Sequence, residues 1–193
     1  MSRIMNTLCV AALVVATSDL GAQDAQSARS GFGMSLGLGN GSAGVTCEGC
    51  GDVEDERMDG LSGYLRMGRH ISPQFFVGVE GTGWMKNSDG WERRIAAVSG
   101  VVLVYPSASA GFFVRGGAGA IRAVIEDASN SATGSGITWQ AGLGYDLGLG
   151  GVALTPYVTY VESMEVALHI NDVSTGFNLN PNILQFGLAV TVQ

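Results

Sequence analysis

Apolar and polar residues alternate one by one along most of the chain from Gly31 onward. In the segment 32–39, Phe, Met and Leu residues occupy the even positions, and Gly or Ser residues occupy the odd positions. Alternate side chains of a β-strand point to opposite sides of its sheet. This period of two therefore predicts a strand with one apolar face and one face of small or polar side chains.

The same pattern recurs to the end of the chain, and no window shows a helical period. It predicts eight strands, near 32–39, 61–70, 75–86, 94–105, 111–124, 138–147, 152–161 and 184–193. A strand needs about 9–11 residues to cross a bilayer at a tilt, and we expect each of these to cross.

The connections between the predicted strands alternate in length. Short joins fall near 70–74, 106–110 and 148–151, and mostly longer, more polar joins fall near 45–60, 87–93, 126–136 and 162–181. Short turns at one end and long loops at the other are typical of outer-membrane barrels. An even number of strands places both chain ends on the short-turn, periplasmic side.

Composition decides which face of the strands points outward. Hydrophobic residues make up 46% of the chain, charged residues only 14%, and there are 30 glycines. The small face carries too few charges to be a water-facing surface. We therefore expect an all-β, antiparallel up-and-down transmembrane barrel, with the apolar face toward lipid and the small face filling a narrow lumen. Leu36, Leu143 and Leu188 should point outward. The alternative is a secreted, lipocalin-like barrel whose apolar face points inward and binds a small hydrophobic ligand.

Several other classes of protein are excluded. The longest apolar run, Leu8 to Ala16, has nine residues, whereas a membrane-spanning helix needs about 20. A net charge of −7, with a single lysine, argues against nucleic acid as a partner. The high hydrophobicity and low charge exclude intrinsic disorder.

The first 22 residues are typical of a secretory signal peptide. Arg3 supplies the positive charge, residues 8–16 form the apolar core, and Gly21-Ala22 offers a cleavage site. We expect a linker over 23–30 and the barrel over 31–193.

Three local features carry a resemblance to a known family. They are Gly142-Leu143-Gly144-Tyr145-Asp146, Leu154-Thr155-Pro156-Tyr157, and the spacing of Gln185, Gly187, Val190 and Val192. With these features, the segment 31–193 resembles the small eight-stranded outer-membrane β-barrel proteins, the OmpA/OmpX-like group. The resemblance implies that Gln185, Gly187, Val190 and Val192 form the signal read by the barrel assembly machinery. Many members end in an aromatic residue, whereas this chain ends in Val192-Gln193.

Charged residues on the small face fall in positions where they can pair across strands. A hairpin that turns about Pro73 places Arg66 opposite Glu80, and a loop centred near 130–131 places Arg115 opposite Asp146. A buried charge is costly without a partner, so we expect both pairs in the lumen as structural ion pairs. A proton or ion pathway is the alternative.

The first predicted loop carries two further candidate sites. Cys47 and Cys50 form a CxxC motif, for which we expect a disulfide in an oxidising compartment; a redox dithiol and a zinc site are the alternatives. Six acidic residues in this loop could bind calcium or simply be solvated: Glu48, Asp52, Glu54, Asp55, Glu56 and Asp59. We expect neither a metal nor a cofactor.

One sequence element raises the question of catalysis. His70-Ile71-Ser72 resembles the His-x-Ser of the outer-membrane lipid A deacylases, with Glu80 as the nearest acid. It lies at a predicted periplasmic turn, away from the leaflet that holds lipid A. We therefore expect a non-catalytic, monomeric outer-membrane protein with a role in envelope integrity or surface adhesion, and an extracellular partner at loops 45–60 and 162–181.

Overall fold

The computed structural model describes residues 29–47, 57–88, 90–126, 131–149, 151–170 and 173–193 of the chain. These residues form nine labelled strands: β1 (Gly31–Cys47), β2 (Met58–Ser72), β3 (Phe75–Ser88), β4 (Trp91–Val104), β5 (Phe112–Glu126), β6 (Ser131–Tyr145), β7 (Leu147–Gly148), β8 (Val152–Ile170) and β9 (Val173–Val192). Among the described residues, no helix is both long enough and apolar enough to cross a membrane.

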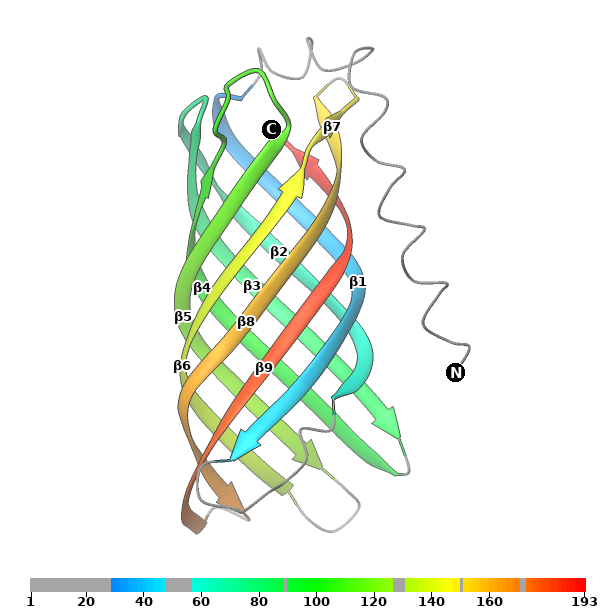
Figure 1. Ribbon diagram of the computed structural model, residues 1–193, viewed down its shortest axis with the longest axis vertical. Coiled ribbons are helices and arrows are strands. Elements are labelled where there is room, and N and C mark those ends of the chain that lie inside the picture. The colour runs from blue at the N-terminus through cyan, green and yellow to red at the C-terminus, as the bar shows by residue number, and fades with distance from the viewer. Residues whose placement is uncertain (1–28, 48–56, 89, 127–130, 150, 171–172) are drawn as a thin grey trace, which may run out of the picture.

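The strands form one closed antiparallel barrel (Figure 1). From β1 to β6 each strand pairs with the next in sequence, β8 pairs with β9, and β1 pairs with β9 to close the ring. The two-residue β7 follows β6 after Asp146, and both pair with β8. The nine labelled strands therefore make eight positions around the barrel, which confirms the predicted all-β, eight-stranded, up-and-down architecture.

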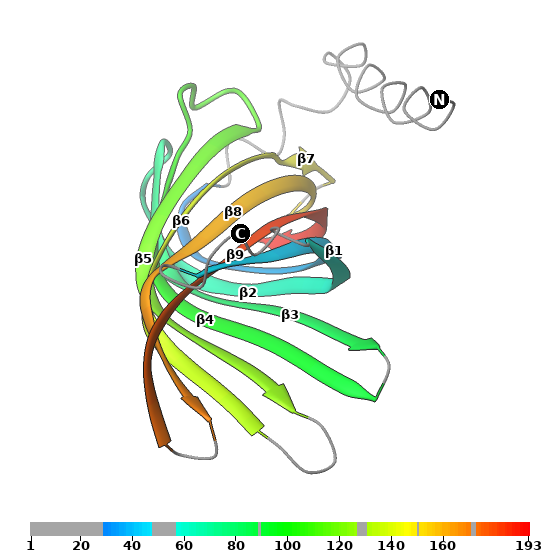
Figure 2. The ribbon, with the colours of Figure 1, turned by 60° about the horizontal axis from the view of Figure 1, so that its bottom comes forward.

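The two ends of the barrel differ. At the end we call the turn end, short connections join β2 to β3, β4 to β5 and β7 to β8, and the chain terminates there at Gln193 (Figure 1). At the opposite end, which we call the loop end, the strands run toward residues 48–56, 89, 127–130 and 171–172, which lie outside the described residues. Figure 2 brings the loop end forward and shows the β3–β4, β5–β6 and β8–β9 hairpins reaching it.

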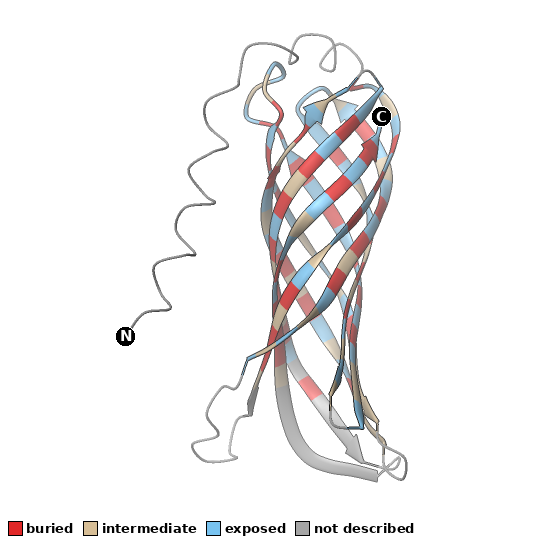
Figure 3. Cartoon of the chain, turned by 90° about the vertical axis from the view of Figure 1, so that its right-hand side faces the viewer, coloured by how far each residue is buried: buried red, intermediate tan, exposed pale blue. Residues whose placement is uncertain are grey.

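The apolar rows point away from the barrel axis. Leu36, Leu143 and Leu188 expose 54%, 50% and 55% of their surface, whereas the residues between outward positions are largely buried. Figure 3 shows this alternation of buried and exposed positions along the strands. The orientation is the one expected of a barrel surrounded by lipid, and it argues against the water-soluble, lipocalin-like alternative.

The strands extend farther toward the loop end than the sequence pattern indicates. The predicted loop 162–181 belongs mostly to β8 and β9, β6 begins at Ser131 instead of after 136, and β3 and β4 reach Ser88 and Trp91. These three predicted loops were therefore too long. Gly90, with φ of 80°, lies in the short β3–β4 connection and adopts a conformation that favours glycine. Outside the bilayer the outer face of a strand meets water, so the apolar alternation fades while the hydrogen-bonded ladder continues.

Candidate functional site

The centre of the lumen holds a buried carboxylate between two buried guanidinium groups. Glu80 of β3 lies directly opposite Arg66 of β2, and their closest charged atoms, Arg66 Nη1 and Glu80 Oε2, are 3.6 Å apart. Arg115 of β5 reaches the same oxygen with Nη1 at 2.6 Å. We call Arg66, Glu80 and Arg115 the charged layer. All three side chains are almost fully buried, so the ion pairs are shielded from water.

The predicted pair between Arg115 and Asp146 is wrong. Arg115 lies opposite Gly142, because the β5–β6 hairpin pairs Phe112 with Tyr145 and Glu126 with Ser131. The prediction centred this loop about two residues too late, which moved the expected partner by four positions. An even shift keeps a residue on the same face, so Asp146 still points into the lumen, but nearer the turn end.

Arg115 makes further contacts that the sequence did not indicate. Its Nη2 donates a hydrogen bond to the Thr159 hydroxyl, and its guanidinium carbon lies 4.7 Å and 5.6 Å from the ring centres of Tyr64 and Tyr157. A Cβ added to Gly142 would lie 3.0 Å from Arg115 Nε. The glycine opposite Arg115 therefore provides the space in which the guanidinium lies.

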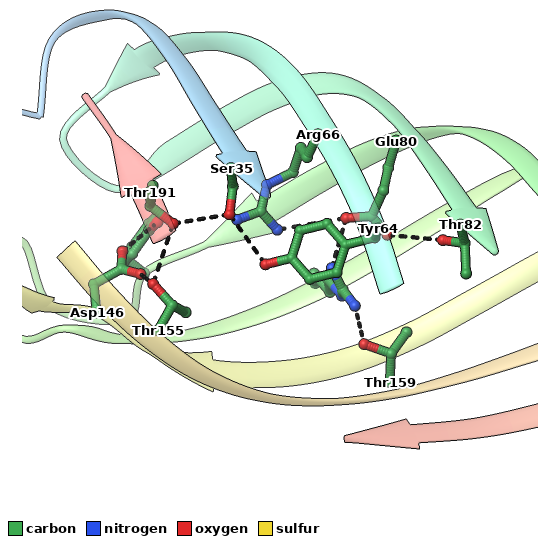
Figure 4. Close-up of polar contacts among 11 residues, drawn as sticks. Ser35, Tyr64, Arg66, Glu80, Thr82, Asp146, Thr155, Thr159 and Thr191 are labelled. Carbon is green, nitrogen blue, oxygen red and sulfur yellow. Dashed lines mark hydrogen bonds and ion pairs between the residues drawn. The ribbon is translucent and has the colours of Figure 1, made fainter. Parts of the chain in front are cut away.

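Asp146 is the acceptor for a chain of hydroxyl groups near the turn end (Figure 4). Tyr105 donates to Asp146 Oδ2 at 2.9 Å, and Thr155 donates to Asp146 Oδ1 at 2.7 Å. Further hydroxyl contacts of 3.1, 2.8 and 3.1 Å link Thr155 to Thr191, Thr191 to Ser35 and Ser35 to Tyr64. Because Tyr64 also flanks Arg115, this hydroxyl chain connects Asp146 to the charged layer.

Large side chains fill the lumen at the turn end. The cluster consists of Phe76, Val101, Leu103, Tyr105 and Phe113. Arg29, from the segment before β1, places its guanidinium carbon 4.1 Å from the Tyr105 ring centre and donates a hydrogen bond to the Ala110 carbonyl at 3.0 Å. The turn-end cluster, the hydroxyl chain and the charged layer are thus connected, since Tyr105 binds Asp146 and Ser35 lies opposite Arg66.

The motif considered for catalysis is not arranged as a triad in the described residues. The buried His70 ring packs 5.1 Å from the ring centre of Phe76 and 5.9 Å from that of Tyr105. Ser72 Oγ accepts a hydrogen bond from the backbone amide of Gln74. Glu80, the candidate acid, is bound to the two arginines of the charged layer.

The remaining predicted residues lie in β1 and β9 or outside the described residues. In β9, Gln185 is buried in the lumen, Gly187 lies opposite Gly39, and Val190 and Val192 face outward. Cys47 is the last residue of β1, whereas Cys50 and most of the acidic loop lie outside the described residues, as does the segment 1–22.

Sequence reasoning missed the residues that complete the lumen network. Tyr64 and Thr159 each lie two residues from another lumen-facing position on their strands, and Tyr105, just after β4, follows the buried Leu103 by two, so the alternation itself could have placed them. Most of their partners could not be identified, because the contacts of Tyr64 and Thr159 with Arg115 and of Tyr105 with Asp146 join segments that are not neighbours in sequence. The alternation of apolar and polar residues could not indicate Arg29, because Arg29 precedes the first strand.

Known proteins with a similar fold were found only by structure. No protein-family model matches the sequence, and no curated protein matches it. The crystal structure of Neisserial surface protein A matches with a TM-score of 0.57 and 15% identity, covering 84% of this chain and 97% of that one. Ail, the attachment invasion locus protein of Yersinia pestis, matches with a TM-score of 0.57 and 11% identity, covering 84% and 99%. The chain therefore has the fold of the small eight-stranded outer-membrane barrels.

Proposed function

We propose that this protein is a non-catalytic, monomeric barrel of the bacterial outer membrane whose lumen does not conduct ions, and that it acts through its loop end. The observation that carries the proposal is the charged layer. Arg66, Glu80 and Arg115 come from three strands and meet at one carboxylate oxygen across the centre of the lumen. An eight-stranded barrel leaves an interior just wide enough for side chains to fill, so these groups occupy the path that an ion would take.

The outward face supports placement in a membrane. Its leucines, valines and phenylalanines would be an aggregation hazard in water, whereas acyl chains solvate them. We propose that residues 1–22 direct export to the periplasm, and that the pattern ending β9 directs insertion by the assembly machinery. The turn end would then face the periplasm, and the loop end would face the exterior.

The length of the strands supports a role at the loop end. β8 and β9 contain 19 and 20 residues, whereas about 9–11 cross a bilayer, so this hairpin extends beyond the membrane. Ail has been crystallised with the heparin analogue sucrose octasulfate, so a barrel of this fold can present a binding surface. The present chain has a net charge of −7, and we propose a partner at 45–60 and 162–181 whose chemistry differs from that of a polyanion.

The closed lumen predicts that the purified protein forms no steady ion channel. Planar bilayers containing the folded protein should show the conductance of bare lipid, whereas a general porin prepared in the same way should give stepwise openings. Heat-modifiable migration on gels would establish that the protein is folded before insertion. Reproducible conductance steps of uniform size from the folded protein would contradict a closed lumen.

The proposed disulfide predicts that Cys47 and Cys50 do not react with a thiol reagent in mature protein isolated without reductant. After reduction, two thiols per chain should react, because cleavage of the signal removes Cys9. Titration of denatured protein with and without reductant measures both states. Two reactive thiols before reduction would refute the bond, and a C47S/C50S variant controls for background labelling.

A further inference from the structure

The lumen between the charged layer and the loop end is lined by apolar side chains. Its buried cluster consists of Ala43, Trp84, Ile95, Ala97, Ile121, Val161, Val166 and Ile183. Unlike the cluster at the turn end, it does not fill the space it encloses. A cavity of about 190 Å³ remains, bounded by Met58, Trp84, Ile95, Ala123 and Val166 among others. We call it the loop-end cavity.

Small residues create this cavity. Ala43, Ala123, Ala132 and Gly134 occupy its wall on β1, β5 and β6, where larger apolar residues would have closed it. Packed protein interiors leave few voids larger than a water molecule, so a void of this size is not ordinary core packing. An apolar cavity with one polar end is the usual form of a site for a small hydrophobic ligand.

Two cations lie at the loop end of the cavity on the lumen side. Arg93 borders the cavity directly. Lys86, the single lysine of the chain, is its partner in the β3–β4 ladder. Both alternate with buried lumen residues, since Lys86 follows Trp84 by two positions and Arg93 precedes Ile95 by two. Within the described part of the chain, neither side chain has an ion-pair partner.

Among the described residues, the carboxylates nearest to these cations do not neutralise them. Glu92 and Glu126 lie on the outer wall of the barrel, where Arg94 binds them at 2.9 Å and 3.2 Å. Like charges directly opposite each other on neighbouring strands destabilise a sheet. Within the described part of the chain, the facing pair Lys86 and Arg93 therefore lacks a counter-ion, and a bound anion would supply one.

We propose that the loop-end cavity binds the anion of a medium-chain free fatty acid, whose alkyl chain is short enough for a cavity of about 190 Å³. The apolar wall would hold the alkyl chain, with Trp84 alongside it, and Lys86 and Arg93 would bind the carboxylate at the open end. A polyanion would find no hydrogen-bond donors on the apolar wall, and an uncharged hydrocarbon would leave the two cations unpaired. The charged layer closes the lumen below the cavity, so the ligand binds without crossing the barrel. This inference goes beyond the proposed role of the loop end in contacting a partner and does not depend on it.

Quenching of Trp84 by a dibrominated decanoate would test the proposal. The protein would carry Trp91→Phe and Trp139→Phe, which leaves Trp84 in the lumen as its single tryptophan. In nanodiscs of unbrominated phosphatidylcholine, we expect saturable quenching by the brominated fatty acid. Nanodiscs made with dibrominated phosphatidylcholine should leave Trp84 fluorescence nearly unchanged, because Trp84 faces away from the bilayer.

Two sets of variants separate the cavity from general surface effects. K86Q/R93Q should raise the half-saturating concentration of dibrominated decanoate about tenfold, which corresponds to about 1.4 kcal/mol. Ala123→Phe, which fills the cavity, should abolish saturable quenching. Arg122→Gln is the matched charge control, because Arg122 is exposed on the outer wall beside Ala123. Each variant must keep its heat-modifiable migration.

Three results would overturn the proposal. They are the absence of saturable quenching in the folded protein, equal quenching by brominated phosphatidylcholine, and an effect of Arg122→Gln as large as that of K86Q/R93Q. The second would show that Trp84 is reached from the bilayer, and the third would show a nonspecific attraction of the anion to a cationic surface.

Discussion

Replacing Glu80 by glutamine should destabilise the folded barrel by about 3–5 kcal/mol, one of the two largest effects expected of any substitution in the described residues. Glu80 is the acidic partner of both Arg66 and Arg115, and all three side chains are buried. Removing one member of a buried ion pair leaves an uncompensated charge, and here it leaves two. The amide of glutamine is nearly isosteric with the carboxylate. The loss of stability would therefore result from the missing charge and not from a change in side-chain volume.

Urea unfolding of the protein in lipid vesicles, followed by tryptophan fluorescence, would measure this loss. The matched control is Glu92→Gln, which removes an exposed carboxylate that pairs with Arg94 and should cost less than about 1 kcal/mol. Arg115→Met should also cost more than Arg66→Met, because Arg115 lies 2.6 Å from Glu80 and Arg66 lies 3.6 Å away. A Glu80→Gln barrel as stable as the Glu92→Gln barrel would show that the charged layer does not hold the lumen together.

The number of strands and their orientation could be predicted because both depend on a local period. The alternation of apolar and small residues in β1 and β9 indicates which residues face lipid without any knowledge of neighbouring strands. In β4 the prediction rested on weaker evidence, since Val101, Val102, Leu103 and Val104 are apolar on both faces. The inward members of that run pack into the turn-end cluster, which period two alone does not reveal.

The partners inside the lumen could be predicted only where a short turn fixes the register. Pro73 lies in the two-residue turn between β2 and β3, and taking it as the centre of the hairpin aligns Arg66 with Glu80. The pair that closes the turn, Ser72 and Phe75, would by itself place Arg66 opposite Gly81, and an irregularity between His70 and Ser72 shifts the register by one residue. The β5–β6 connection is longer, and an error of two residues in its centre gave Arg115 the wrong partner. The contact of Arg115 with Glu80 joins β5 to β3 across the axis, and no pattern along the chain encodes such a contact.

Substituting valine for Gly187 should prevent closure of the barrel or destabilise it by at least about 3 kcal/mol. Gly187 of β9 lies opposite Gly39 of β1 at the seam that closes the ring. A Cβ on Gly187 would meet the backbone of Leu38 and would lie 2.8 Å from the Gly39 Cα. Backbone atoms held by the β1–β9 ladder cannot move aside as a flexible side chain can, so the cost should reach or exceed the upper range for overpacking.

Gly83→Val is the matched control for this substitution. Gly83 lies on the outward face of β3, and a Cβ added there meets no atom within 4 Å, so we expect a change below about 1 kcal/mol. Refolding into vesicles without the assembly machinery isolates the steric effect from any loss of the insertion signal at the end of β9. Gly39→Val introduces the same clash from β1, outside that signal, and should impair refolding into vesicles to the same degree. If Gly187→Val refolds normally in vesicles while failing to insert in cells, Gly187 serves recognition by the machinery and not the packing of the seam.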